Sequence, residues 1–197
     1  MSILIPTIRG IVGGTPRLID FGGVQTPPGG GVAQRLNRIG NRFGIDIEMP
    51  SLDTAGDGRV VIARLCRALT EGGLFAFPAT IDPGNPGAPV VNVGGQTGST
   101  LNLRGFTPGY TASEGQFFSI IYGGRRYLHG VSADAAADSY GMMSLPIFPM
   151  LRISPNDGAV CEFATPYIEG FLSGNAQEWT LPASRYLNVK FTVTEAA

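Results

Sequence analysis

Hydrophobic and polar positions between residues 96 and 171 follow the pattern of short β-strands separated by turns. Each apolar run there is rich in β-branched or aromatic residues and ends near Gly, Pro, Asn, Asp or Ser. Successive runs lie too close together for the crossover helix of a βαβ unit. The pattern therefore predicts a compact β-module, either a small sandwich or a partly closed barrel. The runs are Thr100–Arg104, Gln116–Tyr122, Arg126–Val131, Gly141–Ile147 and Ala159–Phe163.

The segments on either side of this module predict a second sheet. After the module, Leu187, Val189, Phe191 and Val193 alternate with polar residues, which is typical of a strand with one buried face. No other unpaired strand is predicted nearby, so we expect this final strand to return to the N-terminal sheet. The N-terminal strands are expected at Ile3–Gly13, Arg17–Phe21, Asn41–Met49 and Leu74–Phe77.

One helix is predicted, at Asp57–Glu71. Thr54 or Asp57 is expected to cap its start, and Gly72-Gly73 to end it. Since no second helix is predicted, its apolar stripe is expected to pack on a sheet. The stripe consists of Val61, Leu65 and Leu69, widened by Ile62 and Cys66.

Pro and Gly residues between Thr80 and Gly95 predict a linker into the β-module, and residues 173–176 predict the return from it. The expected division is a first domain made of residues 1–82 plus 174–197, split by an inserted β-module at residues 83–173. Within the first domain, the run Thr-Pro-Pro-Gly-Gly-Gly at Thr26–Gly31 predicts a flexible loop or arm.

Composition narrows the function classes. The formal net charge of −1 gives no electrostatic argument for a bound nucleic acid. Only 15% of the residues are charged and 43% are hydrophobic, which suggests that neighbours in an assembly cover part of the surface. No apolar run approaches the length of a membrane span, and the first residues do not resemble a signal peptide. Cys66 and Cys161 are far apart, and we expect two buried free thiols rather than a disulfide.

Candidate catalytic and metal-binding residues do not form a recognisable constellation. The single histidine, His129, lies in a predicted strand and lacks an identifiable carboxylate or nucleophile. One histidine and two distant cysteines make a zinc site improbable. The run Gly94–Gly98 has no lysine and no following helix, so we interpret it as a turn and not a phosphate loop. Glutamates are candidates for a catalytic acid–base pair and aspartates for a calcium loop, but their spacing selects neither kind of site. These residues are Glu114, Glu162 and Glu169, and Asp134 and Asp138.

Basic and aromatic residues allow two binding hypotheses. Five arginines could contact a nucleic-acid backbone, although a solvated face or ion pairs between subunits fits the overall charge better. Exposed aromatic residues could stack on sugar rings. The arginines are Arg35, Arg38, Arg42, Arg125 and Arg126, and the aromatic residues are Tyr110, Tyr122, Tyr127 and Trp179. Without a catalytic constellation, the sequence predicts a structural or binding protein and not an enzyme, with no cofactor and no metal.

Six blocks of sequence stand out when they are taken in order: Gly94–Gly109, Glu114–Ser119, Gly124–Val131, Met142–Arg152, Ser154–Val160 and Ala164–Gly170. Together they resemble the tail proteins of long-tailed (siphovirus-like) bacteriophages, especially distal tail or baseplate-hub proteins. The resemblance extends over roughly residues 74–195, and the order of the blocks carries it rather than any single motif.

This resemblance implies a tail-tube-like β-sandwich with one flanking α-helix, split by an inserted small β-barrel (OB-like) or β-sandwich. It implies a homo-oligomer, a hexameric ring that joins the tail tube to the tip and surrounds the DNA channel, with DNA only as passing cargo. Its partners would be the tail-tube protein and other baseplate proteins, and it would reside in the virion tail tip after synthesis in the host bacterial cytoplasm. The family offers no catalytic, cofactor-binding or metal-binding residues. The Thr26–Gly31 arm would be ordered by contact with an adjacent subunit.

Two alternatives remain open from the sequence. The chain could be another tail-tube or tail-completion subunit. A tail-tube protein would polymerise into long filaments, whereas a hub should stop at one or two rings. It could instead be a carbohydrate-binding β-module of a tail adhesin.

Overall fold

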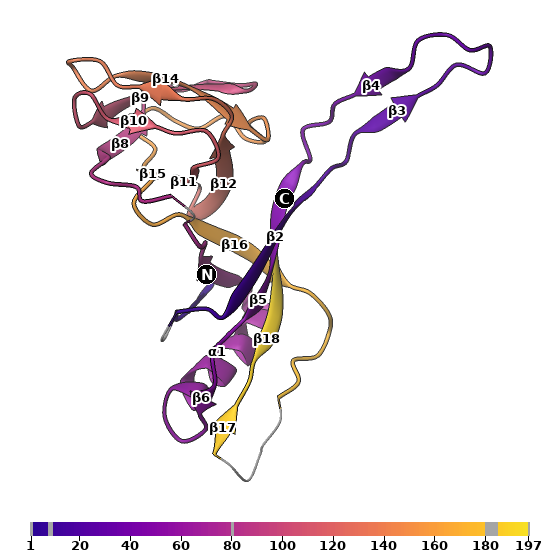
Figure 1. Cartoon of the computed structure of the whole chain (residues 1–197), viewed down its shortest axis with the longest axis vertical. Coiled ribbons are helices and arrows are strands. Elements are labelled where there is room, and N and C mark those ends of the chain that lie inside the picture. The colour runs from indigo at the N-terminus through magenta and orange to yellow at the C-terminus, as the bar shows by residue number, and fades with distance from the viewer. Residues whose placement is uncertain (1, 8–9, 80, 180–184, 197) are drawn as a thin grey trace.

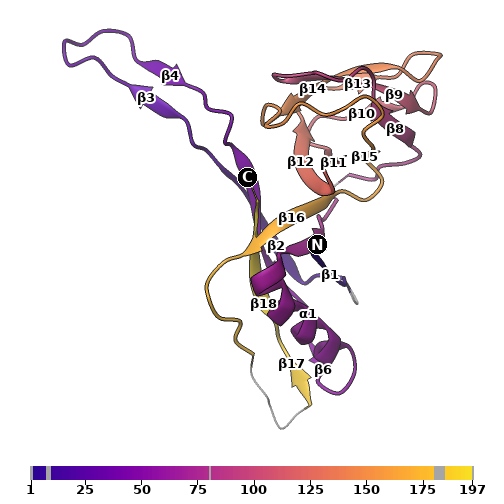
Figure 2. The same ribbon diagram turned by 180° about the vertical axis from the view of Figure 1, so that it is seen from behind.

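A computed structural model describes residues 2–7, 10–79, 81–179 and 185–196. Over these residues the chain is mainly β with a single α-helix, as the sequence predicts. Two six-stranded sheets form the body. Figures 1 and 2 show the second sheet curled above the first, while a long two-stranded hairpin extends away from both.

The first sheet combines both ends of the chain. The predicted closing strand is confirmed, because Phe191 and Val193 of β18 lie opposite Ile47 and Ile45 of β5. All neighbours in this sheet are antiparallel except β1 and β7. Its order is β1 (Ile3–Ile5), β7 (Gly73–Ala76), β16 (Tyr167–Leu172), β18 (Lys190–Glu195), β5 (Arg42–Glu48) and β2 (Gly13–Ile19).

Strand β16 corrects the expected placement of residues 167–172 within the inserted segment. It pairs with β7 and β18 of the first sheet, so the chain has already left the second sheet before Tyr167. The burial pattern of β16 is not a simple alternation, and the sequence of a strand does not identify the strands with which it pairs. Gly170 permits the pairing, since a Cβ at this position would lie 1.9 Å from the Thr194 carbonyl oxygen.

The N-terminal strands also differ from the prediction. The expected strand Ile3–Gly13 is divided, because β1 ends at Ile5 and β2 begins at Gly13. Pro6 follows β1 directly, and a proline has no N–H group with which to continue a ladder. Strand β5 matches the expected Asn41–Met49 closely, whereas β2 begins earlier than the expected Arg17–Phe21.

The single helix, α1 (Asp57–Glu71), has the predicted bounds and packs on the first sheet. Its cap is different from the prediction, since the N-cap residue is Gly56 and no side chain caps it. Gly72 ends the helix with a φ of 86° and a ψ of 153°, a conformation open to glycine but different from the expected left-handed helical stop. Cys66 lies on the exposed face, so the predicted stripe is wrong there. The buried positions are Gly58, Val61, Leu65 and Ala68, with Ile62 and Leu69 half-buried.

The core of the first sheet lies on its helix-facing side. Phe191 and Phe75 make an edge-to-face contact with ring centroids 5.6 Å apart. All four alternating residues of the C-terminal segment, from Leu187 to Val193, are buried there as predicted. The opposite face presents polar side chains such as Asp46 and Lys190.

The second sheet is nearly closed and barrel-like. Its two edge strands meet through a bridge between Val90 and Val160, and the Val91 N–H donates to the Ala159 carbonyl at 2.9 Å. Phe118 and Phe163 stack inside it with centroids 4.5 Å apart. All five predicted runs contain strands of this sheet. Its order is β15 (Cys161–Glu162), β11 (Phe117–Tyr122), β12 (Arg125–Val131), β14 (Met143–Phe148), β9 (Thr100–Phe106) and β8 (Gly87–Val91).

Three short pairs complete the described structure. Strands β10 (Thr111–Ala112) and β13 (Ala135–Ala136) pair beside the barrel-like sheet, and β6 (Leu52–Asp53) and β17 (Tyr186–Leu187) pair near α1. The third pair, β3 (Gly23–Gln25) with β4 (Gln34–Leu36), lies in the extended hairpin.

Candidate interaction surfaces

His129 lies inside the protein and takes no part in an exposed site. Its side chain is fully buried, and Nδ1 donates to the Pro149 carbonyl oxygen at 2.9 Å. Burial, with a further contribution from the Arg152 charge, lowers the pKa of His129 to about 3. The imidazole is therefore neutral at physiological pH and serves the packing of β12, the reading that the sequence favours.

The glutamates that the sequence singled out hold the chain together. Glu162 accepts hydrogen bonds from Ser119 at 2.6 Å and from Arg126 Nε at 3.0 Å. Glu169 accepts from the Ser2 hydroxyl at 2.6 Å and from the Arg126 backbone N–H at 2.9 Å. Both carboxylates are thus occupied by structural contacts, and Glu114 is exposed elsewhere on the barrel-like sheet.

Asp134 and Asp138 fix turns of the backbone. Asp134 accepts the Glu114 N–H at 2.7 Å, and Asp138 accepts the N–H groups of Tyr140 and Met142 at 2.8 Å each. Among the described residues, no group of three or more His, Cys, Asp or Glu side chains is arranged to hold a metal ion. Gly94–Gly98 lies between β8 and β9 in a turn, as expected.

The five arginines do not share one surface. Arg35 pairs with Asp20 on the hairpin, and Arg38 is exposed near it. Arg42 lies over the Phe21 ring at 4.7 Å, at the base of the hairpin. Arg126 is bound to Glu162 at the junction of the two sheets, and Arg125 is exposed beside it.

The four aromatic candidates are also dispersed. Tyr110 stacks on Phe106 at 5.4 Å, and its hydroxyl accepts a hydrogen bond from Gln116. Tyr122 is half-buried, and Tyr127 lies beneath the Arg152 guanidinium at 5.5 Å. Trp179 is 42% exposed and lies outside the barrel-like sheet. They do not combine into one stacking platform.

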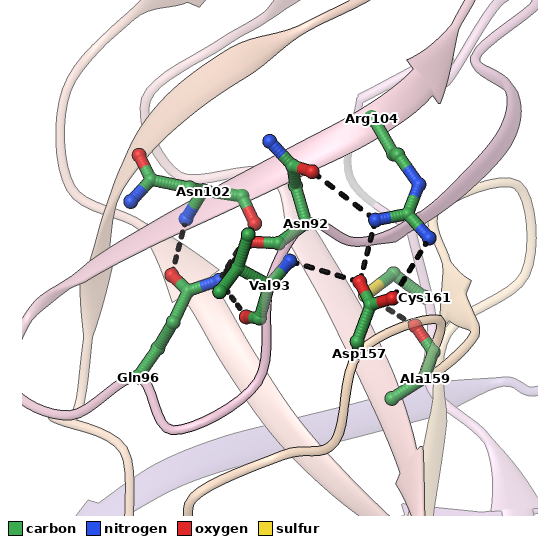
Figure 3. Close-up of polar contacts among 8 residues, drawn as sticks. All are labelled: Asn92, Val93, Gln96, Asn102, Arg104, Asp157, Ala159 and Cys161. Carbon is green, nitrogen blue, oxygen red and sulfur yellow. Dashed lines mark hydrogen bonds and ion pairs between the residues drawn. The ribbon is translucent and has the colours of Figure 1, made fainter.

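A polar network holds an exposed loop at the end of the barrel-like sheet (Figure 3). Val93 has a φ of 68°, which is strained for a β-branched residue. Its N–H donates to Asp157 Oδ1 at 2.9 Å, and its carbonyl accepts from Gln96 Nε2 at 2.9 Å. Arg104 also pairs with Asp157, and this hydrogen bond holds the pKa of Asp157 below its usual range. The loop therefore presents an exposed valine on a fixed backbone.

A buried ion pair joins the barrel-like sheet to the first sheet. Glu195 on β18 accepts the Phe43 N–H at 2.7 Å, the Leu128 N–H at 2.8 Å and Arg152 Nη2 at 2.6 Å. Burial raises the pKa of Glu195, while Arg152 and the two N–H groups oppose the rise. Losing one partner of such a pair would leave a buried charge uncompensated.

Apolar rings reinforce this junction. Phe43 contacts Phe117 edge-to-face at 5.4 Å, and Phe77 contacts Phe117 at 4.7 Å. Phe148 of the barrel-like sheet also contacts Phe43, at 6.0 Å. Since both the aromatic contacts and the Arg152–Glu195 ion pair hold the junction, the barrel-like sheet has a fixed position on the first sheet.

The hairpin at residues 20–40, hereafter the arm, is the most unusual surface of the chain. Every residue from 23 to 39 is exposed, and β3 and β4 pair only with each other. The exposed fractions of Val24 and Val32 are 62% and 88%. Figures 1 and 2 show the arm extending past the first sheet, clear of the barrel-like sheet. A two-stranded hairpin is only marginally stable in water without a packed face, so the arm is suited to contact a partner.

A groove of about 870 Å³ lies on the polar face of the first sheet, between β5, β18 and the chain that follows β16. Its charged lining is mostly acidic, with Asp46, Glu48 and Glu178 against Lys190. Asp46 accepts a hydrogen bond from the Thr192 hydroxyl at 2.6 Å, and this bond and the Arg17 pair lower the pKa of Asp46. Trp179 is also part of the lining, so the groove combines acidic groups with one exposed indole ring.

Sequence reasoning found the tip of the arm but missed its length, the groove and the buried Glu195. The Pro-Pro-Gly-Gly-Gly run marked only the turn, because the flanking β3 and β4 are three residues each and lack a hydrophobic alternation. The groove is formed by segments that are distant in sequence, and no local pattern reports it. None of the helical residues in the described ranges forms a segment long and apolar enough to cross a membrane. Comparison of the chain with protein-family models and with curated proteins found no match.

Proposed function

We propose that this chain is a structural subunit that assembles with further copies of itself, and that the arm is an assembly element. The observation that carries the proposal is that every residue from 23 to 39 is exposed, including Val24 and Val32. Apolar side chains on a two-stranded ribbon gain little stability from the ribbon itself, so a neighbouring chain must cover them. The low content of charged residues, 15%, fits a surface that is partly covered in an assembly.

Within that class, we propose a ring at the distal end of a long-tailed phage tail. The first sheet with α1 would be the tail-tube-like sandwich, and the barrel-like sheet would be the OB-like module standing outside the ring. The ring would be hexameric, would contact the tail-tube protein and other baseplate proteins, and would reside in the virion tail tip. The net charge of −1 suits a channel through which DNA passes without being held. The support for this assignment is the resemblance of the sequence blocks together with the arm.

Electron microscopy of the purified chain tests this proposal. A distal hub should give rings that stop at one or two layers, whereas a tail-tube subunit would grow into filaments. Particles that stay monomeric at every concentration, with or without a tail-tube protein, would refute the assembly proposal. A carbohydrate-binding role gains no support, since Tyr110, Tyr122, Tyr127 and Trp179 do not share one surface.

A further inference from the structure

We propose that the arm of one chain docks in the acidic groove of a second copy of the same chain. This inference rests on the proposed self-assembly and names the two surfaces that meet. The groove is the one on the polar face of the first sheet that Asp46, Glu48, Glu178 and Trp179 help to line.

The positions of the two surfaces along β2 and β5 favour docking between copies. β2 leads into the arm at Ile19, and β5 returns from it at Arg42. The groove lies at the other end of the same strand pair, where Gly13 and Glu48 are opposite each other. Figure 1 shows the arm extending beyond one end of β2 and β5. Since the groove lies at the other end of these strands, the arm projects away from the groove of its own chain and is available to a second copy.

The charges of the two surfaces are complementary. The arm contains Arg35 and Arg38 against a single acid, Asp20, and Arg35 already pairs with Asp20. Arg38 is exposed and leaves the arm with a net positive charge. The groove lining has three carboxylates and one lysine. Asp46 pairs with Arg17 and Glu48 with Lys190, so Glu178 leaves the groove with a net negative charge. Opposite charges on docking surfaces set register and select the partner.

The apolar parts are complementary as well. The tip of the arm presents Pro27 and Pro28, both exposed, next to the exposed Val32. The groove presents the half-exposed indole of Trp179. Proline rings commonly dock on aromatic side chains that line a groove, because a proline segment loses little conformational entropy on binding. Trp179 is thus the expected anchor for the tip.

Docking an arm into a different surface of the next copy is a head-to-tail contact. Such contacts generate closed rings or open filaments, whereas a self-complementary patch would stop at a dimer. The arm–groove contact therefore accounts for assembly beyond two chains, whereas a reciprocal exchange of arms between two chains would stop at a dimer and give a covalent dimer in place of a ladder.

Disulfide trapping tests the contact directly. In a Cys66→Ser background, a chain with both Val32→Cys and Ala176→Cys should form a ladder of covalent multimers on mild oxidation. Val32 is at the arm tip, and Ala176 is an exposed residue of the groove lining. Each single variant, and a control with Val32→Cys and Ser144→Cys, should give no ladder, because Ser144 is exposed on the barrel-like sheet.

Charge exchange is the second test. Arg38→Glu and Glu178→Arg should each weaken assembly by a few-fold, and the two changes in one chain should restore part of the loss, because the net charges of the arm and the groove would again be opposite. Both residues are exposed, so the thermal transition of the isolated chain should be unchanged. Assembly without the covalent ladder and without charge rescue would overturn the arm–groove contact and leave self-assembly intact. A chain that never assembles would overturn both proposals.

Discussion

Replacing Phe191 with alanine tests whether the C-terminal strand belongs to the core of the first sheet. Phe191 is 6% exposed, lies on β18 opposite Ile47, and meets Phe75 edge-to-face at 5.6 Å. The substitution removes the transfer free energy of a buried ring and leaves a cavity beside Phe75. We expect Phe191→Ala to lower the free energy of unfolding by about 3–5 kcal/mol, including the loss of the ring pair.

The adjacent residue provides a matched control. Lys190 lies on the other face of β18 and pairs with Glu48 at 3.0 Å, but the two side chains are 70% and 44% exposed. An ion pair so exposed is screened by solvent, so Lys190→Ala should change the free energy of unfolding by no more than about 0.5 kcal/mol. Urea denaturation of dilute protein, followed by circular dichroism, measures both. Equal stabilities for Phe191→Ala and the wild type would show that β18 is an appendage.

Three further outcomes follow from single groups. The pKa of His129 is lowered to about 3, so its NMR signals should not titrate between pH 8 and 5. The unfolded chain binds that proton near pH 6.5 and the folded chain does not, so the free energy of unfolding should fall as the pH drops from 6.5 toward 3. A folded-state titration midpoint near pH 6.5 would contradict the burial of the ring. Burial and the Glu162 charge raise the pKa of Cys161 to about 12. A thiol reagent at pH 8 should therefore modify the exposed Cys66 quickly and Cys161 only on unfolding, and equal rates of modification would contradict the burial of Cys161. Asp157→Asn should lower the protection of the Val93 amide against hydrogen exchange, measured relative to the intrinsic exchange rate at the same pH. Acid should lower the same protection in the wild type, since the lowered pKa of Asp157 means that the stabilisation present at neutral pH is lost as the carboxylate is protonated. Unchanged protection in both would show that the carboxylate does not hold the loop.

Local patterns in the sequence were sufficient to predict the helix and the strands that bury one face and expose the other. Helix α1 and the alternation from Leu187 to Val193 were predicted correctly, because a stripe or an alternation directly reports which side is buried. The same patterns do not report which neighbour does the burying. For that reason β16 was assigned to the inserted module, although it pairs with β7 and β18.

The interaction surfaces were harder to predict for a physical reason. Glu195 ends an amphipathic strand and looks like a solvated terminal acid, yet it accepts three hydrogen bonds inside the junction from residues distant in sequence. Cys66 fits the apolar stripe by spacing and is nevertheless exposed, because the covered side of α1 runs through Gly58, Val61, Leu65 and Ala68. The arm has no core of its own, so no hydrophobic periodicity marks it.

The most direct test of the assembly proposal compares the intact chain with one whose arm is shortened. Replacing residues 23–36 with a two-residue Asn-Gly turn would remove β3 and β4 and keep the base of the arm, where the Phe21 N–H donates to Asn41 at 2.8 Å. Light scattering over a range of concentrations should give a defined multimer for the intact chain and a monomer for the shortened one, with equal thermal transitions for the two in dilute solution. Identical masses for the two proteins, whether monomeric or multimeric, would contradict the role assigned to the arm.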